Sequence, residues 1–126
     1  MGNNKTFGAF GESLATDYLS KNGYRVIERN FSCRSGEIDI IALHGDTVAF
    51  IEVKTRSSER FGLPSEAVST AKQRKIVKTA LYYMQKNRLL DHMCRFDVIE
   101  IISEVESSSR INLIQDAFQY SGKYGY

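Results

Sequence analysis

Two strand-like segments separated by a turn decide the fold of this chain. The first segment reads Gly36-Glu37-Ile38-Asp39-Ile40-Ile41-Ala42, and the second reads Phe50-Ile51-Glu52-Val53-Lys54. His44-Gly45-Asp46-Thr47 lies between them and is typical of a tight hairpin, because Gly and Asp tolerate the positive φ that such turns need. We therefore expect an antiparallel pair of strands at the centre of the chain.

The alternation of side chains along these strands brings three charged residues together. A two-residue loop at Gly45-Asp46 places Asp39 directly opposite Glu52, whereas a loop at His44-Gly45 makes the two acids diagonal neighbours. In either register Asp39, Glu52 and Lys54 project from the same side of the sheet. Two facing carboxylates are destabilising unless a positive charge lies between them. The pattern therefore predicts a site for a divalent cation, with Lys54 as a further charge beside it.

Composition indicates a single globular domain, residues 1–126. The chain has 126 residues, of which 42% are hydrophobic and 25% are charged, values that are ordinary for a domain with one core. No apolar run approaches the length of a membrane span, and no hydrophobic segment of the signal-peptide kind follows the first residues. Cys33 and Cys94 follow no metal-ligand spacing, so we expect free thiols in a reducing compartment. These features predict a cytoplasmic protein without a membrane partner.

Basic residues follow directly after the Glu52 segment. Between positions 54 and 78 seven Lys or Arg residues stand against two Glu residues. On charge alone a solvated helix face explains this run equally well, but its position beside the predicted carboxylate pair favours contact with the phosphates of a nucleic acid. The candidates for that contact are Arg56, Arg60, Lys72, Gln73, Arg74 and Lys75. Gln73 is included because an inward-pointing amide near the start of a helix needs partners or serves as a ligand for water or phosphate.

Helical periodicity predicts two long helices. The first spans 7–22, with Thr6 as N-cap and Asn22-Gly23 as the C-terminal stop. Its apolar stripe is formed by Phe7, Phe10, Leu14 and Tyr18. The second helix spans 70–87 and is capped by Ser69 or Thr70. One face of it carries Ile76, Val77, Ala80, Leu81 and Met84.

The remaining segments predict strands over 24–31, 95–102 and 111–114. We expect loops at 57–63 and 103–110, with Pro64 in the first turn of a helical segment. The strand of Glu52, the second helix and the strand over 95–102 then form a right-handed βαβ unit. The sequence thus predicts an α/β fold, a mixed five-stranded sheet flanked by helices in the order α-β-β-β-α-β-β.

Glu12 is a further carboxylate in the first predicted helix. On a helical wheel Glu12 lies away from the apolar stripe and shares a side with Gly8, Ala15 and Leu19. Small residues beside an acid let that helix face lie close to another element, which brings Glu12 over the sheet toward Asp39 and Glu52. An exposed helix glutamate is the simpler interpretation of the same pattern.

These residues resemble the motifs of a known group of enzymes. Gly36-Glu37-Ile38-Asp39 followed by Glu52-Val53-Lys54-Thr55-Arg56 resembles the PD-(D/E)XK nuclease superfamily, with archaeal Holliday junction resolvases nearest in pattern. More narrowly, the chain resembles the bacterial YraN family of nuclease-like proteins over nearly its full length. That resemblance also covers Gly8, Gly11-Glu12, Ala15, Tyr18-Leu19, Gly23-Tyr24, Arg29-Asn30-Phe31, Phe61-Gly62, Pro64, Glu66-Ala67-Val68, Lys72 and Arg95-Phe96-Asp97-Val98.

The resemblance implies a restriction-endonuclease-like core and an Mg²⁺- or Mn²⁺-dependent endonuclease that hydrolyses phosphodiester bonds in DNA. It implies that Asp39, Glu52 and the backbone carbonyl of Val53 bind the metal. Lys54 then orients the attacking water or stabilises charge on the phosphate, and Glu12 helps to hold the metal or its waters. Mg²⁺ prefers such oxygen ligands together with waters and substrate phosphate, and a compact ammonium group suits a phosphate contact.

Three interpretations stay open at this point. The chain is either an active nuclease, perhaps on branched DNA, or a nucleic-acid-binding module with this fold and little catalysis of its own. In a third interpretation the charged residues only form salt bridges, for example Lys54 with Glu37. The proline that names the superfamily is Ile38 here, which keeps the strand. Branch recognition depends on how two sites are spaced, so a homodimer stays open as well.

Overall fold

A computed structural model describes residues 3–57, 68–103 and 109–119 of the protein. The elements follow one another as α1 (Asn3–Lys21), β1 (Tyr24–Cys33), β2 (Gly36–His44), β3 (Thr47–Ser57), α2 (Thr70–Lys86), β4 (Met93–Ser103) and β5 (Ser109–Phe118). This order confirms the predicted α-β-β-β-α-β-β arrangement. Each strand extends beyond its predicted bounds, because the hydrogen bonding between strands continues past the apolar residues from which a strand is predicted.

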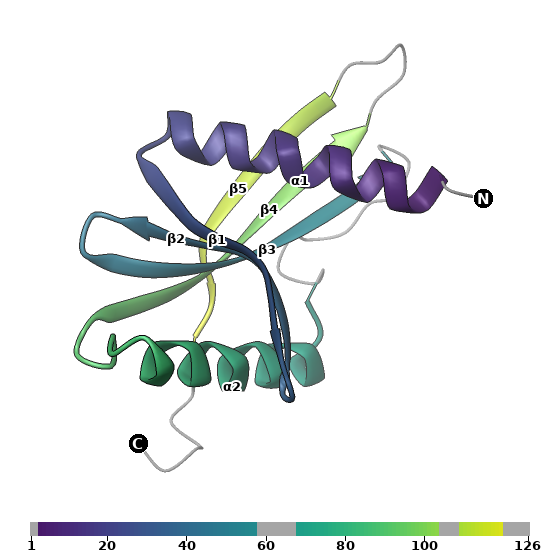
Figure 1. Ribbon diagram of the computed structural model, residues 1–126. Helices are drawn as coiled ribbons and strands as arrows, with labels where there is room; N and C mark the ends of the chain where they lie inside the picture. The colour runs from purple at the N-terminus through teal and green to yellow at the C-terminus, as the bar shows by residue number, and fades with distance from the viewer. Residues whose placement is uncertain (1–2, 58–67, 104–108, 120–126) are drawn as a thin grey trace.

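The five strands form one mixed sheet that lies between the two helices. The strands lie side by side in chain order, with β3 and β4 parallel and every other neighbouring pair antiparallel. Helix α1 covers one face of the sheet and helix α2 covers the other (Figure 1). The α/β sandwich predicted from the sequence is therefore confirmed.

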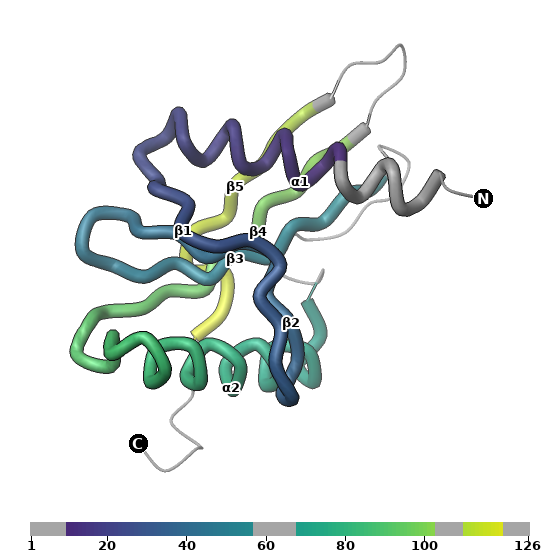
Figure 2. The backbone as a smooth tube through the Cα atoms, in the orientation of Figure 1, coloured from purple at the N-terminus to yellow at the C-terminus, as the bar shows by residue number. Residues whose placement is uncertain are grey.

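The hairpin between β2 and β3 has the loop at Gly45-Asp46, the first of the two predicted registers. His44 pairs with Thr47, and Gly45 has a φ of 64° in the turn. The paired residues of β2 and β3 end at Ile40 and Ile51. Beyond that point β2 stays paired with β1 as far as Gly36 and turns toward α2 (Figure 2). Strands β2 and β3 therefore separate one residue before Asp39 and Glu52 would face each other.

Each face of the sheet has its own hydrophobic core. The core under α2 is built by Phe31, Ile38, Ile41, Val48, Phe50, Val68, Ile76, Val77, Ala80, Tyr83, Met84, Phe96 and Val98. The core under α1 is built by Ala15, Leu19, Tyr24, Ile40, Ala42, Ala49, Ile51, Ile99 and Ile101. Alternate residues of β3 enter different cores, as side-chain alternation requires. Glu52 and Lys54 therefore continue the row of Val48 and Phe50 on the α2 face.

Helix α1 corrects two predictions. It begins at Asn3 rather than after a cap at Thr6, and it does not use the aromatic stripe as its buried face. Phe10 is 54% exposed, whereas Gly11, Ala15 and Leu19 are buried. A Cβ atom on Gly11 would lie 2.5 Å from Cγ2 of Thr55 in β3. The small side chains thus let α1 approach the sheet closely, and that approach outweighs the apolar stripe.

Helix α2 follows its prediction closely. Ser69 is the N-cap, and its hydroxyl accepts a hydrogen bond from the backbone N–H of Lys72 at 3.2 Å. Most of the predicted loop over 57–63, Pro64 and positions 104–108 lie outside the described residues. Ser109 and Arg110, which were predicted to be in a loop, belong to β5. In the part of the chain that the structure describes, neither helix is long and apolar enough to cross a membrane.

Candidate functional site

A cluster of four charged residues lies where β2 and β3 separate. Asp39 comes from β2, Glu52 and Lys54 come from β3, and Lys72 comes from the first turn of α2. The structure thus brings together the three residues that strand alternation placed on one face, and it adds a lysine from a distant segment. We call these four residues the charged cluster.

The carboxylate of Asp39 accepts a backbone hydrogen bond from β3 at the point where β2 and β3 are no longer paired. Asp39 Oδ2 accepts a hydrogen bond from the backbone N–H of Val53 at 2.8 Å, just beyond the last paired residues of β2 and β3. Burial, and then the nearby negative charge of Glu52, raise the pKa of Asp39 from 3.8 to about 6. Two carboxyl groups this close resist carrying two negative charges at once. The arrangement therefore favours a bound cation.

Two ammonium groups supply positive charge to the cluster. Glu52 is 5% exposed, and its Oε2 atom lies 2.6 Å from Lys72 Nζ. Burial lowers the pKa of Lys54, and the neighbouring ammonium of Lys72 lowers it further. Burial is also the largest single influence on Lys72 and lowers its pKa, but the hydrogen bond and the charge of Glu52, together with Lys54 and Asp39, outweigh burial and raise the pKa overall. Lys72 is therefore held charged against Glu52, while Lys54 is the ammonium group more easily deprotonated.

The donor atoms of the cluster suit a hard divalent cation. In the described ranges, no three His, Cys, Asp or Glu side chains gather around a common point, so the acidic ligands are limited to Asp39 and Glu52. Mg²⁺ is commonly held by one or two carboxylates, with water and substrate phosphate oxygens in the remaining positions. This donor set fits Mg²⁺ or Mn²⁺ and does not fit a closed zinc site.

Glu12 is not joined to the charged cluster by any contact among the described residues. Its Oε1 atom lies 3.5 Å from Nη2 of Arg29 in β1, and its side chain is 21% exposed. Helix α1 packs on the face of the sheet opposite α2, so Glu12 and Glu52 approach the sheet from different sides. A role for Glu12 in holding a metal or its waters stays a prediction.

The predicted phosphate-binding residues divide into several groups. Lys72 belongs to the charged cluster, whereas Arg74 and Lys75 are exposed on α2. Gln73 is half-buried, and its amide donates to the carbonyl of Val68 at 3.0 Å. Arg56 Nη2 forms an ion pair with the buried Glu100 at 2.8 Å, and Arg60 lies outside the described residues.

A cavity of about 390 Å³ adjoins the charged cluster. It lies between the start of β2 and the first turns of α2, and it is lined by Gly36, Glu37, Ser69, Ala71, Lys72, Lys75 and Ile76. Two of its lining residues carry ammonium groups. The cavity therefore offers room for an anionic group beside Lys72 and Lys75.

Sequence reasoning counted Lys72 among the basic residues but missed its contact with Glu52. One feature of the sequence could have indicated this contact. Lys72 stands in the first turn of α2, which contains no acidic residue, although the positive end of the helix dipole favours acids at that position. A lysine there indicates a compensating partner elsewhere in the fold.

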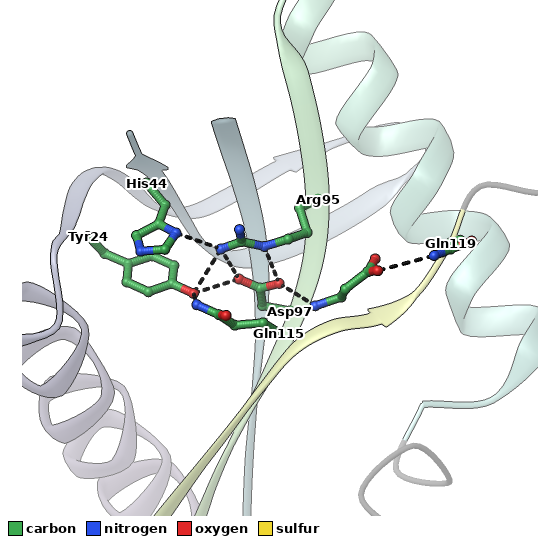
Figure 3. Close-up of polar contacts among 7 residues, drawn as sticks. Tyr24, His44, Arg95, Asp97, Gln115 and Gln119 are labelled. Carbon is green, nitrogen blue, oxygen red and sulfur yellow. Dashed lines mark hydrogen bonds and ion pairs between the residues drawn. The ribbon is translucent and has the colours of Figure 1, made fainter. Parts of the chain in front are cut away.

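A second polar network, also missed from the sequence, lies on the α1 face of the sheet (Figure 3). Asp97 is fully buried. Arg95 donates to both of its oxygens, at 2.9 and 3.0 Å. The Tyr24 hydroxyl and the backbone N–H of Asp116 donate at 2.9 Å each. The amide of Gln115 donates to the Tyr24 hydroxyl at 2.8 Å.

His44, which the sequence placed at the predicted hairpin turn, also belongs to this network. Its ring stacks on Tyr24 with a centroid distance of 4.2 Å, and its Nδ1 atom lies 3.1 Å from Arg95 Nη2. The residue ends β2 and is half-buried. Its closeness to Tyr24 follows from the pairing of β1 with β2, which juxtaposes the two residues.

Comparison with known proteins places the chain among relatives of similar length. A model of the uncharacterised protein family UPF0102 matches residues 11–101, and the YraN family is this same family. The chain is 47% identical to a UPF0102 protein of Clostridium perfringens, over 92% of this chain and 96% of the relative. It is 48% identical to one of Caldanaerobacter subterraneus, over 92% and 97%. It is 51% identical to one of Clostridium tetani, over 92% and 96%.

Proposed function

The chain belongs to the uncharacterised protein family UPF0102, and from the charged cluster we propose that it is a metal-dependent nuclease that hydrolyses DNA phosphodiester bonds. The observation that carries the proposal is the pair of carboxylates at the point where β2 and β3 separate. A half-buried acid with its pKa raised to about 6, beside a second acid and two ammonium groups, is characteristic of a functional site.

Asp39 and Glu52 would hold Mg²⁺ or Mn²⁺ in this proposal, together with the backbone carbonyl of Val53. When bound, such an ion polarises the phosphate and lowers the pKa of a coordinated water. Lys54 orients the attacking water or stabilises the charge that develops on the phosphate. A lysine with a lowered pKa exchanges a proton more readily than an exposed one.

The surface beside the cluster is suited to a polyanion. Lys75 lines the cavity next to Lys72, and Arg74 is exposed on the same helix. Positive charge at a cleft attracts nucleic acid and makes affinity depend strongly on salt. We propose DNA in the cytoplasm as the substrate, with branched DNA cut by a homodimer as one form of this activity.

One observation favours a second candidate function, a nucleic-acid-binding module with little catalysis. Lys72 neutralises Glu52 at 2.6 Å, so the side chains of the cluster balance one another's charge. In this case Lys72, Arg74 and Lys75 bind phosphates and no bond is cut.

A cleavage assay separates the two candidates. Labelled linear, flapped and four-way-junction DNA is incubated with the protein in Mg²⁺, Mn²⁺ or EDTA. The catalytic proposal expects metal-dependent products that fall at least ~100-fold in Asp39→Asn and Lys54→Ala, since each change removes a group that acts in the chemical step. Asp46→Asn and Lys78→Ala are matched controls on the exposed turn and on the exposed face of α2. Salt-sensitive DNA binding without products under any metal would support the binding module instead.

A further inference from the structure

Helix α2 places an ammonium group directly on one of the two acids of the charged cluster. Lys72 Nζ lies 2.6 Å from Glu52 Oε2, and the Glu52 side chain is 6% exposed. A charge-assisted hydrogen bond of this length to a buried carboxylate is a strong contact. Lys72 therefore neutralises Glu52 by direct contact.

The position of Lys72 in its helix makes this contact informative. The residue stands three positions after the N-cap Ser69, and its backbone N–H donates to the Ser69 hydroxyl. The positive end of the helix dipole is unfavourable for a lysine there. Glu52 supplies the negative charge that offsets this cost, because no acid occupies the first turn of the helix.

The charge balance of the cluster changes when a divalent cation enters. Asp39 and Glu52 contribute two negative charges, and Lys54 and Lys72 contribute two positive charges. A divalent cation leaves the cluster with a surplus of two positive charges. A phosphodiester group, which carries one negative charge, would reduce this surplus.

The structure also shows where Lys72 has room to move. Its side chain is 44% exposed, although its ammonium is held at Glu52. The same residue lines the cavity of about 390 Å³ beside Gly36 and Lys75. A lysine side chain is long and flexible, so its ammonium can leave Glu52 for an anion in the cavity without movement of the helix backbone.

We propose that Lys72 is a built-in cation that neutralises Glu52 before metal binds and then leaves Glu52 to bind a substrate phosphate. This inference rests on the proposed function, because it takes Asp39 and Glu52 as the metal ligands. Metal and phosphodiester then bind cooperatively, since the metal frees the ammonium that the phosphate requires. By linkage, the phosphate raises the affinity for the metal by the same factor.

Metal binding without DNA tests the first half of the proposal. Mn²⁺ affinity is measured by calorimetry for the wild-type protein, Lys72→Met and Lys78→Met. We expect Lys72→Met to bind Mn²⁺ at least about tenfold more tightly, because no ammonium competes for Glu52, and to show a larger Mn²⁺-induced rise in melting temperature. Lys78→Met removes an exposed charge from the same helix and should match the wild type.

DNA binding tests the second half. The affinity for a fluorescent DNA duplex is measured by anisotropy in Mn²⁺ and in EDTA. The gain in affinity that Mn²⁺ confers should be at least about threefold smaller in Lys72→Met than in the wild type and Lys78→Met. An equal gain in all three proteins would overturn the phosphate role of Lys72.

The outcomes separate this inference from the proposed function. If the wild type binds Mn²⁺ and Lys72→Met binds it no more tightly, the inference is wrong and the metal site stands. If neither protein binds Mn²⁺, both are wrong. If only Lys72→Met binds Mn²⁺, the competition by Lys72 is supported. Should Lys72→Met fail to fold, Mg²⁺ titration of the wild type followed by the NMR shift of Lys72 Cε decides, and an unchanged shift overturns the inference.

Discussion

Two buried acids on neighbouring strands of this sheet have opposite environments. Asp97 of β4 pairs in register with Ile51 of β3, one residue before Glu52. Asp97 faces α1, whereas Glu52 faces α2 on the other side of the sheet. The two carboxylates therefore share the same backbone neighbourhood and differ only in what surrounds their side chains.

Both carboxylate oxygens of Asp97 accept hydrogen bonds. Arg95, Tyr24 and the backbone N–H of Asp116 all donate to it. Glu52 instead faces a second acid, Asp39, and forms an ion pair with Lys72. A fully satisfied carboxylate stabilises a fold, whereas two facing carboxylates create a demand for a cation. This difference is the physical reason to place function at the charged cluster and structure at Asp97.

The largest expected effect is on the Asp97 network. Arg95→Met removes the two guanidinium hydrogen bonds and the positive charge from a fully buried carboxylate, and we expect a loss of about 3–5 kcal/mol in the free energy of unfolding. Urea denaturation at about pH 7 measures it. Arg25→Met, at an exposed position of β1, should change stability by less than about 0.5 kcal/mol. A loss below about 1 kcal/mol for Arg95→Met would mean that Asp97 is not held by this pairing.

Substitution of Asp39 should raise the free energy of unfolding, whereas Arg95→Met should lower it. Its folded pKa of about 6 lies above the ordinary value of 3.8, so its protonated form favours folding. That contribution is fully present below about pH 4 and is lost as pH rises through 6. In EDTA near pH 7, Asp39→Asn should therefore be more stable than the wild type by about 1–2 kcal/mol.

Urea denaturation in EDTA at several pH values measures the Asp39 effect. The stability gained by Asp39→Asn should shrink as the pH falls from about 7 to 4, because the wild-type carboxyl becomes protonated. Asp97→Asn is the matched change in the other network and should destabilise throughout this range. If Asp39→Asn is less stable than the wild type near pH 7, Asp39 and Asp97 do not differ in the way described.

The close approach of α1 to β3 gives a smaller effect. Gly11→Ala would bring a Cβ atom to 2.5 Å from Thr55 Cγ2, and we expect a loss of about 1–2 kcal/mol from overpacking. Thr55→Ser removes that methyl group, so the double variant should recover most of the loss. Thermal denaturation of the two single variants and the double variant measures the coupling. Independent, additive effects would contradict a direct contact.

The smallest stability effect is expected at Glu12. Its contact with Arg29 is long and partly exposed, so Glu12→Gln should cost less than about 0.5 kcal/mol. The same variant tests the role that the resemblance implies, because that role requires weaker Mn²⁺ binding. Calorimetry beside urea denaturation separates the two effects. Unchanged Mn²⁺ affinity would leave Glu12 as a surface residue of α1.

Local patterns in the sequence predicted much of this protein. Alternation along positions 36–42 and 50–54 placed Asp39, Glu52 and Lys54 on one face, and the loop at Gly45-Asp46 was one of the two predicted hairpin turns. Helical periodicity and Ser69 placed α2 within one residue of its observed end. These features depend on a few successive residues, so they can be read without knowledge of the rest of the chain.

Tertiary packing decided the remaining features. Helix α1 buries Gly11, Ala15 and Leu19 rather than its aromatic stripe, because close contact with β3 needs small side chains. Lys72 reaches Glu52, and Tyr24 reaches Asp97 across 73 positions of sequence. No local pattern specifies such contacts, because they depend on how helices and strands far apart in the chain pack against the same sheet.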